Sequence, residues 1–126
     1  MPQPAHAAEV IAVIARAVEL TQSGAASGVV TCPINKKALK DGAGFAYPGH
    51  TEYLAALGGV DRVVMMLACD ALKVVPVTIH IPISDVPGAL TRDLLSDTIR
   101  ITHAALRRDF GFDNPRLAVT GLNPHA

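Results

Sequence analysis

Residues 91–126 read TRDLLSDTIRITHAALRRDFGFDNPRLAVTGLNPHA, and this stretch decides the fold class. Apolar and small residues recur at helical spacing from Thr91 to Phe110, which predicts an amphipathic helix with an inward face of Leu94, Leu95, Ile99, Thr102 and Leu106. Thr91 is a good N-cap, and Gly111 ends the helix. The run Arg116–Thr120 (RLAVT) then predicts a short strand. A long helix followed by a strand is typical of α/β proteins.

The rest of the chain alternates between the same two kinds of element. Helical spacing and capping residues predict helices over Ala5–Leu20, Asn35–Leu39 and Thr51–Leu57. Runs of β-branched residues predict strands over Gly28–Thr31, Arg62–Ala68 and Leu72–Ile79. A turn at residues 69–71 would join the last two strands in an antiparallel pair, with Pro76 at an edge or a bulge.

The composition limits the classes of protein to which the chain can belong. Its 126 residues have the size of one small domain, and half of them are apolar. The formal net charge is +0, so nothing attracts a polyanion at long range and a nucleic-acid partner is not expected. Glu9, Arg16 and Glu19 interrupt the apolar N-terminal stretch, which argues against a membrane span. Cys32 and Cys69 form no CxxC motif, and a reducing cytoplasm is the expected location.

Polar residues gather where predicted strands end and loops begin, and open α/β sheets bind ligands at such positions. They are Asn35, Lys36, His50, Thr51, His80, Asn123 and His125. Neutral imidazole is the usual ligand of zinc-like ions, and catalytic zinc sites take three protein ligands. Three of the five histidines lie in these loops, but their spacing matches no metal motif. The composition therefore permits a metal site, and hydrogen-bonded loop histidines are the alternative.

Asn35 and Lys36 are candidates for contacting a phosphate, because a helix start offers backbone N–H donors and lysine adds a positive charge. The sequence contains no GxxxxGK[ST], which excludes a P-loop. It also contains no GxGxxG, so a Rossmann cofactor site is not expected in this segment. A solvated helix lysine is the alternative for Lys36.

Several ordered motifs resemble one enzyme family. The strings TCPINK, YPGHTE and GLNPHA at Thr31–Lys36, Tyr47–Glu52 and Gly121–Ala126 closely resemble the TAPINK, PGHTE and GLNPHAGE motifs of the 4-hydroxythreonine-4-phosphate dehydrogenase family. The segments Val64–Ala68 and Val77–Pro82 are similar to that family's VMMLA and VTTHLPL segments. The resemblance covers Val29 to Ala126, and Cys32 stands where alanine is usual.

The resemblance implies an architecture and a set of roles. Family members have a few hundred residues in two α/β domains of the isocitrate/isopropylmalate dehydrogenase-like type, and they form homodimers that share a metal site. Residues 1–126 would be a single partial α/β segment, an internal fragment without the family's N-terminal and C-terminal regions. The substrate-binding pair falls on His50 and Thr51, and two of three metal ligands fall on His80 and His125. Asn35, Lys36 and Asn123 would lie in the vicinity of the phosphorylated substrate.

The implied activity is NAD- or NADP-dependent oxidation, with decarboxylation, of 4-phosphooxy-L-threonine to 3-amino-2-oxopropyl phosphate in pyridoxal 5'-phosphate biosynthesis. A divalent metal, Zn, Mg or Co, would assist. The third histidine, the other substrate-binding residues and most of the NAD site fall outside the chain, so the isolated chain is expected to be inactive. One alternative is a sister dehydrogenase that oxidises phosphothreonate or phosphoerythronate. The other is a non-catalytic truncated remnant.

Overall fold

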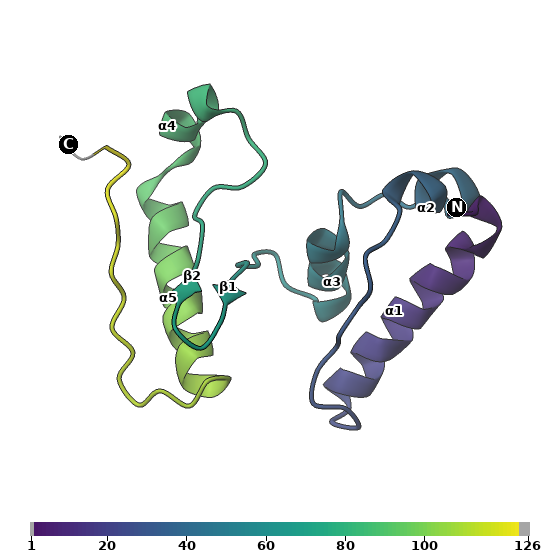
Figure 1. The fold of residues 1–126 in the computed structure, drawn as a ribbon, viewed down its shortest axis with the longest axis horizontal. Helices are drawn as coiled ribbons and strands as arrows, with labels where there is room; N and C mark the ends of the chain where they lie inside the picture. The colour runs from purple at the N-terminus through teal and green to yellow at the C-terminus, as the bar shows by residue number, and fades with distance from the viewer. Residues whose placement is uncertain (1, 124–126) are drawn as a thin grey trace. The chain divides into compact units, whose positions relative to one another are not determined.

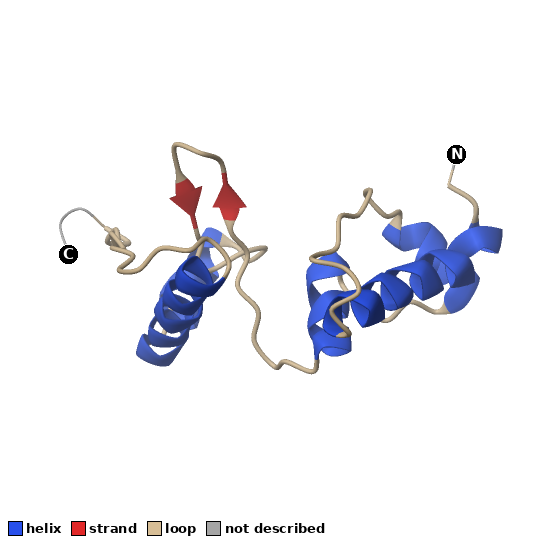
Figure 2. Ribbon diagram, turned by 90° about the horizontal axis from the view of Figure 1, so that it is seen from below, coloured by secondary structure: helices blue, strands red, loops and turns tan. Residues whose placement is uncertain are grey.

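The computed structural model describes residues 2–123 and divides the chain into two compact units, Met1–Val63 and Val64–Ala126 (Figure 1). Helices dominate both units, and the described strands form one hairpin in the second unit (Figure 2). The mixed α/β class predicted from the sequence is confirmed, with more helix than strand. Among residues 2–123, no helix has the length and apolar character that a membrane crossing requires.

The first unit is a helical assembly on an aliphatic and aromatic core. The 3-10 helix η1 (Pro4–His6) leads into α1 (Ala7–Gln22), which contacts both α2 (Lys36–Ala43) and α3 (His50–Gly58). The core of this unit consists of the buried residues Ala7, Ile14, Leu39, Phe45 and Tyr53. All three helices of the first unit were predicted, with boundaries that differ by one to four residues.

Side-chain capping differs between the helices of the first unit. The Asn35 side chain accepts a hydrogen bond from the backbone N–H of Ala38 at 2.9 Å, which confirms the predicted cap of α2. This helix ends at Gly44, whose φ of 63° is accessible to glycine at little cost. Helix α3 begins after Gly49 and has no side-chain cap. The start of α3 therefore depends on tertiary contacts more than the start of α2 does.

The second unit contains a hairpin and the long helix α5. Strands β1 (Leu67–Ala68) and β2 (Lys73–Val74) are antiparallel, with Leu67 opposite Val74 and Ala68 opposite Lys73. The 3-10 helix η2 (Ile83–Asp85) and α4 (Val86–Ala89) precede α5 (Arg92–Arg108). The predicted Thr91 cap is confirmed, because its hydroxyl accepts from the N–H of Leu94 at 3.1 Å. The buried face of α5 consists of Thr98, Thr102 and Leu106.

The inward face of α5 differs in part from the prediction. Thr102 and Leu106 are buried as expected, whereas Leu94, Leu95 and Ile99 are half-buried. Thr98 lies four residues before Thr102 on the same stripe and is buried, although the prediction left it out. Its hydroxyl donates to the Leu94 carbonyl at 2.8 Å, so the burial leaves no unsatisfied donor.

The predicted strands are the main correction. Gly28–Thr31 and Arg116–Thr120 are not strands, and the pairing of Arg62–Ala68 with Leu72–Ile79 shrinks to two residues on each side. A β-branched run favours an extended backbone, but a strand also needs a hydrogen-bonded neighbour. The described chain supplies no such neighbour to Gly28–Thr31 or Arg116–Thr120. Four residues, 69–72, separate the two strands instead of the predicted three, and within this turn Cys69 N–H donates to Leu72 O at 2.9 Å.

Candidate functional site

The predicted substrate pair opens helix α3. His50 and Thr51 are the first two helical residues, and Gly49 before them is extended, with φ −171° and ψ −167°. Thr51 therefore lies inside the first turn and is not the N-cap, which removes its most ordinary structural role. Glu52 follows in the first turn, where a carboxylate interacts favourably with the helix dipole.

The His50 imidazole has an unsatisfied nitrogen. Its Nε2 atom is buried and has no hydrogen-bond partner within residues 2–123. The residue lines a pocket of about 690 Å³ in the first unit, together with the apolar face of α1 and residues 29–35. Asn35 lines the same pocket, so the structure brings these two predicted site residues together. A buried polar atom without a partner costs about 1–3 kcal/mol, and a ligand that supplies the partner removes that cost.

Three aromatic rings lie beside this helix start. The rings of Phe45 and Tyr53 meet edge to face with centroids 5.3 Å apart, and Tyr47 lies 5.4 Å from Phe45 and 5.0 Å from Tyr53. The Tyr53 hydroxyl donates to the carbonyl of Ile11 in α1 at 3.2 Å. Burial, and secondly the proximity of Tyr47, raises the pKa of Tyr53. These rings were not among the predicted site residues, although their closeness to His50 in the sequence was a usable signal.

Lys36 is exposed at the first position of α2. The neighbouring Lys37 pairs with Asp41 one turn later, whereas Lys36 makes no ion pair within the described chain. The Asn35 carboxamide oxygen is already committed to its cap. Of the two residues, Lys36 supplies the positive charge for a phosphate, and Asn35 can still offer its carboxamide N–H₂ as a donor.

His80 occupies an uncommon backbone conformation in the second unit. Its φ is 59°, and no other non-glycine residue among 2–123 has a positive φ. The left-handed region costs an ordinary residue roughly 1–2 kcal/mol. The side chain is exposed and forms no hydrogen bond or ion pair with the rest of the described chain. Strain of this kind is often retained at functional sites, and an imidazole with both nitrogens available fits the role of a metal ligand.

The remaining predicted site residues lie at the end of the second unit. Asn123 is exposed, and His125 lies outside the described residues. Among residues 2–123, no three His, Cys, Asp or Glu side chains come together as a metal site. The predicted ligand pair of His80 and His125 therefore stays a prediction, as does any proximity of this pair to His50 and Thr51.

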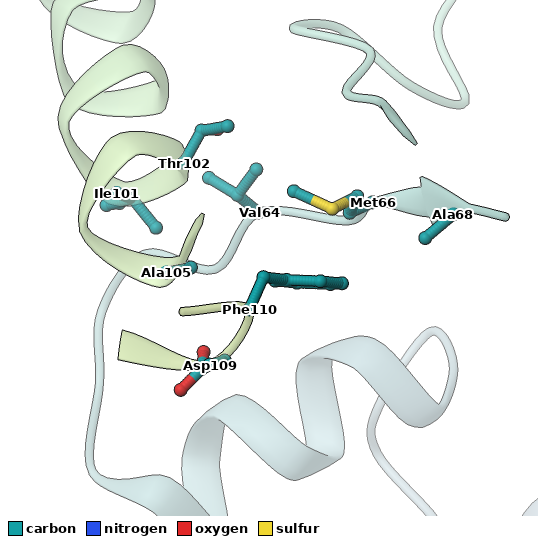
Figure 3. Close-up of a pocket in the computed structure, with 8 residues that line it drawn as sticks. All are labelled: Val64, Met66, Ala68, Ile101, Thr102, Ala105, Asp109 and Phe110. Carbon is teal, nitrogen blue, oxygen red and sulfur yellow. The ribbon is translucent and has the colours of Figure 1, made fainter. Parts of the chain in front are cut away.

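A smaller pocket lies against α5 in the second unit (Figure 3). It has a volume of about 230 Å³ and is lined by Val64, Met66, Ala68, Ile101, Thr102, Ala105, Asp109 and Phe110. The buried hydroxyl of Thr102 has no partner within the described residues. Asp109 makes two hydrogen bonds to Arg108, which hold the pKa of its carboxyl below the usual value. No residue predicted for substrate or metal lines this pocket.

Comparisons with known proteins agree on one family. The family model described as "Pyridoxal phosphate biosynthetic protein PdxA" matches residues 1–126. The 4-hydroxythreonine-4-phosphate dehydrogenase of Paracoccus denitrificans is 64% identical over 129 residues, which cover 99% of this chain and 40% of that protein. The enzyme of the same name from Roseobacter denitrificans is 63% identical over 126 residues, covering 99% and 39%.

Solved structures show the same likeness. The 4-hydroxythreonine-4-phosphate dehydrogenase of Klebsiella pneumoniae matches with a TM-score of 0.91 and 36% identity, over 99% of this chain and 38% of that one. The protein of that name from Burkholderia phymatum matches with a TM-score of 0.87 and 42% identity, over 99% and 37%. The chain thus spans about two fifths of the length of the relatives it matches.

Proposed function

The chain belongs to the pyridoxal phosphate biosynthetic protein PdxA family, and on this premise we propose that it forms part of the active site of a 4-hydroxythreonine-4-phosphate dehydrogenase. The reaction is oxidation and decarboxylation of 4-phosphooxy-L-threonine, with NAD or NADP as hydride acceptor. The single observation that carries the proposal is the start of α3, where His50 holds a buried, unpartnered Nε2 atom beside Thr51. The names of the related enzymes support this substrate over a phosphorylated sugar acid.

His50 and Thr51 would bind and orient the substrate. The imidazole Nε2 can donate to or accept from a substrate oxygen, and the Thr51 hydroxyl can do both. Because both residues belong to the first turn of one helix, their relative placement is set by helix geometry. Fixing the reacting carbon in this way contributes to rate through orientation.

A divalent metal fits the residues of the second unit in part. His80 presents an exposed imidazole on a strained loop, and His125 would be the second ligand from this chain. When bound, such an ion lowers the pKa of a substrate hydroxyl and stabilises the negative charge that develops on oxidation. Zn, Mg and Co are all included in the proposal; imidazole nitrogen favours Zn and Co, whereas Mg prefers oxygen ligands.

The reaction also needs a hydride acceptor and contacts to the substrate phosphate. The hydroxyl-bearing carbon loses a hydride to NAD⁺ and its oxygen loses a proton; the keto acid then releases CO₂, and the carbon that carried it takes up a proton. No residue of this chain is assigned to NAD, because the sequence has no glycine-rich dinucleotide turn. We propose that Lys36 lies near the substrate phosphate, and that Asn35 and Asn123 lie in the vicinity of the substrate.

The proposal also includes the assembly. The chain would be one partial segment of a two-domain α/β/α enzyme of the isocitrate/isopropylmalate dehydrogenase-like type, working as a cytoplasmic homodimer with a metal site shared between subunits. A chain that spans two fifths of its relatives would then carry only some of the catalytic groups. By itself it would not oxidise the substrate.

A hybrid enzyme tests this function. The whole chain replaces the region with which it aligns in the Paracoccus denitrificans relative, and NADH formation is followed with 4-phosphooxy-L-threonine. We expect turnover that depends on added divalent metal and is lost in His50→Gln. Phosphothreonate and phosphoerythronate are assayed in parallel. A hybrid that prefers either sugar acid, or that is folded and inactive on all three substrates, would contradict the proposal.

A further inference from the structure

Helix α3 begins without a side-chain cap, and three aromatic rings lie close to its start in the sequence. Both α2 and α5 begin with a side chain that accepts a backbone N–H, namely Asn35 and Thr91. Helix α3 begins after Gly49, which has no such side chain. A glycine N-cap offers no side-chain acceptor, so the first turn of α3 lacks the capping hydrogen bond that α2 and α5 have. Helix α3, which carries the proposed substrate residues, thus begins without a side-chain cap, as α1 and α4 also do.

The aromatic cluster, defined as Phe45, Tyr47 and Tyr53, has members on both sides of the uncapped helix start at Gly49. The sequence contains three Phe, two Tyr and no Trp, so more than half of its aromatic residues lie within eight positions of His50. Tyr47 precedes the helix and Tyr53 lies within it, with ring centroids 5.0 Å apart. Their contact joins the loop before the helix to the body of the helix, across the glycine that provides no cap.

The cluster is also anchored outside α3. Phe45 and Tyr53 are only 7% and 6% exposed, and both belong to the core with α1. The Tyr53 hydroxyl donates to Ile11 O at 3.2 Å, which ties α3 to the backbone of α1. Tyr53 lies three residues after His50 and therefore on the same side of the helix. Displacing its ring moves the turn that carries the imidazole.

We propose that Tyr53 is a positioning residue, which with Phe45 and Tyr47 holds the first turn of α3 and thereby orients His50 and Thr51. The inference rests on the proposed function. The ring does this through packing, so Tyr53→Phe retains the positioning and Tyr53→Leu loses it. Neither change removes a group that touches the substrate.

The first test uses the 126-residue chain with ¹⁵N-labelled histidine. The imidazole signals of His50 are assigned by their disappearance in His50→Gln and followed by NMR. Tyr53→Leu is expected to shift or broaden them, whereas Tyr53→Phe leaves them near their original positions. Phe112→Leu, an aromatic replacement in the second unit, is the matched control and leaves them unchanged. Unchanged His50 signals in folded Tyr53→Leu would overturn the inference. If Tyr53→Leu does not fold, Tyr47→Leu at the more exposed ring decides by the same criterion.

The second test separates positioning from general loss of structure in the hybrid enzyme. A misplaced substrate group is expected to lower kcat/KM for the phosphorylated substrate by about 10- to 100-fold in Tyr53→Leu. In Tyr53→Leu the KM for NAD and the metal content are expected to stay within about twofold of the parent hybrid. Tyr53→Phe is expected to keep kcat/KM for the phosphorylated substrate within about threefold of the parent. A rise in the KM for NAD or a loss of metal that matches the loss of kcat/KM, or an unchanged kcat/KM for the phosphorylated substrate, would overturn the inference. An inactive parent hybrid would count against the proposed function alone, since the NMR measurement on the chain does not depend on turnover.

Discussion

Replacing Gly42 with alanine is expected to destabilise the first unit, although alanine is the better helix former. Gly42 lies within α2, and a Cβ placed on it would overlap the carbonyl oxygen of Pro4. It would also lie 2.7 Å from the Pro4 carbonyl carbon and 2.8 Å from the Cβ of Ala7. These neighbours are backbone and a Cβ, which cannot rotate away. The contact between α2 and η1 must open to accommodate the methyl group.

The magnitude follows from two opposed terms. Overpacking costs about 1–3 kcal/mol and more where backbone must move, so we take the upper end, about 3 kcal/mol. Alanine gains about 1 kcal/mol over glycine within a helix. The expected net loss is about 2 kcal/mol, against a total stability of roughly 3–9 kcal/mol for a unit of this size. Ala7, now 1% exposed, would lose part of its burial in the process.

Urea unfolding followed by tyrosine fluorescence measures this change in the first unit specifically. Both tyrosines of the sequence, Tyr47 and Tyr53, lie in that unit, and the chain contains no tryptophan. Gly28→Ala is the matched control, because an added Cβ there meets nothing within 4 Å and φ is not positive. The control is expected to remain within about 1 kcal/mol of the parent or to be slightly more stable. A Gly42→Ala chain as stable as the control would refute the reasoning.

Four further outcomes are expected. In the hybrid enzyme, His80→Ala and His125→Ala should each abolish metal binding and lower turnover by at least about a hundredfold. His103→Ala should change neither. Near-normal turnover of metal-free His80→Ala would remove the ligand assignment. Thr51→Val should weaken substrate binding in a titration and leave metal content intact, and unchanged affinity and turnover would exclude the substrate role. Because the pKa of Tyr53 is raised above its ordinary 10.0, the first unit should be fully stabilised below about pH 10 and lose stability as pH rises beyond it. That loss should be smaller in Tyr53→Phe, and identical alkaline unfolding curves would contradict it. The isolated chain, assayed with zinc or magnesium, NAD and 4-phosphooxy-L-threonine, should form no NADH, and metal-dependent NADH formation would show a self-contained site.

Much of the helical structure follows from the sequence alone, because the interactions that make a helix are local. A helix bonds each N–H to a carbonyl four residues earlier, and its caps act within three residues. Asn35 and Thr91 could therefore be identified as caps from their position before helical runs, and both make the expected bond. The short motif around His50 and Thr51 likewise locates the proposed substrate pair, which the structure places together in the first turn of α3.

Tertiary structure decided what depends on partners distant in the sequence. The run at Gly28–Thr31 has strand composition and remains unpaired, because a strand takes its hydrogen bonds from another segment that composition does not reveal. The burial of His50 Nε2 without a partner among residues 2–123, and the hydrogen bond from Tyr53 to Ile11 O, arise only in the folded chain. The sequence determined which residues carry the candidate chemistry. Packing between helices decided how the imidazole is held, because a side chain's surroundings are set by segments that only folding brings together.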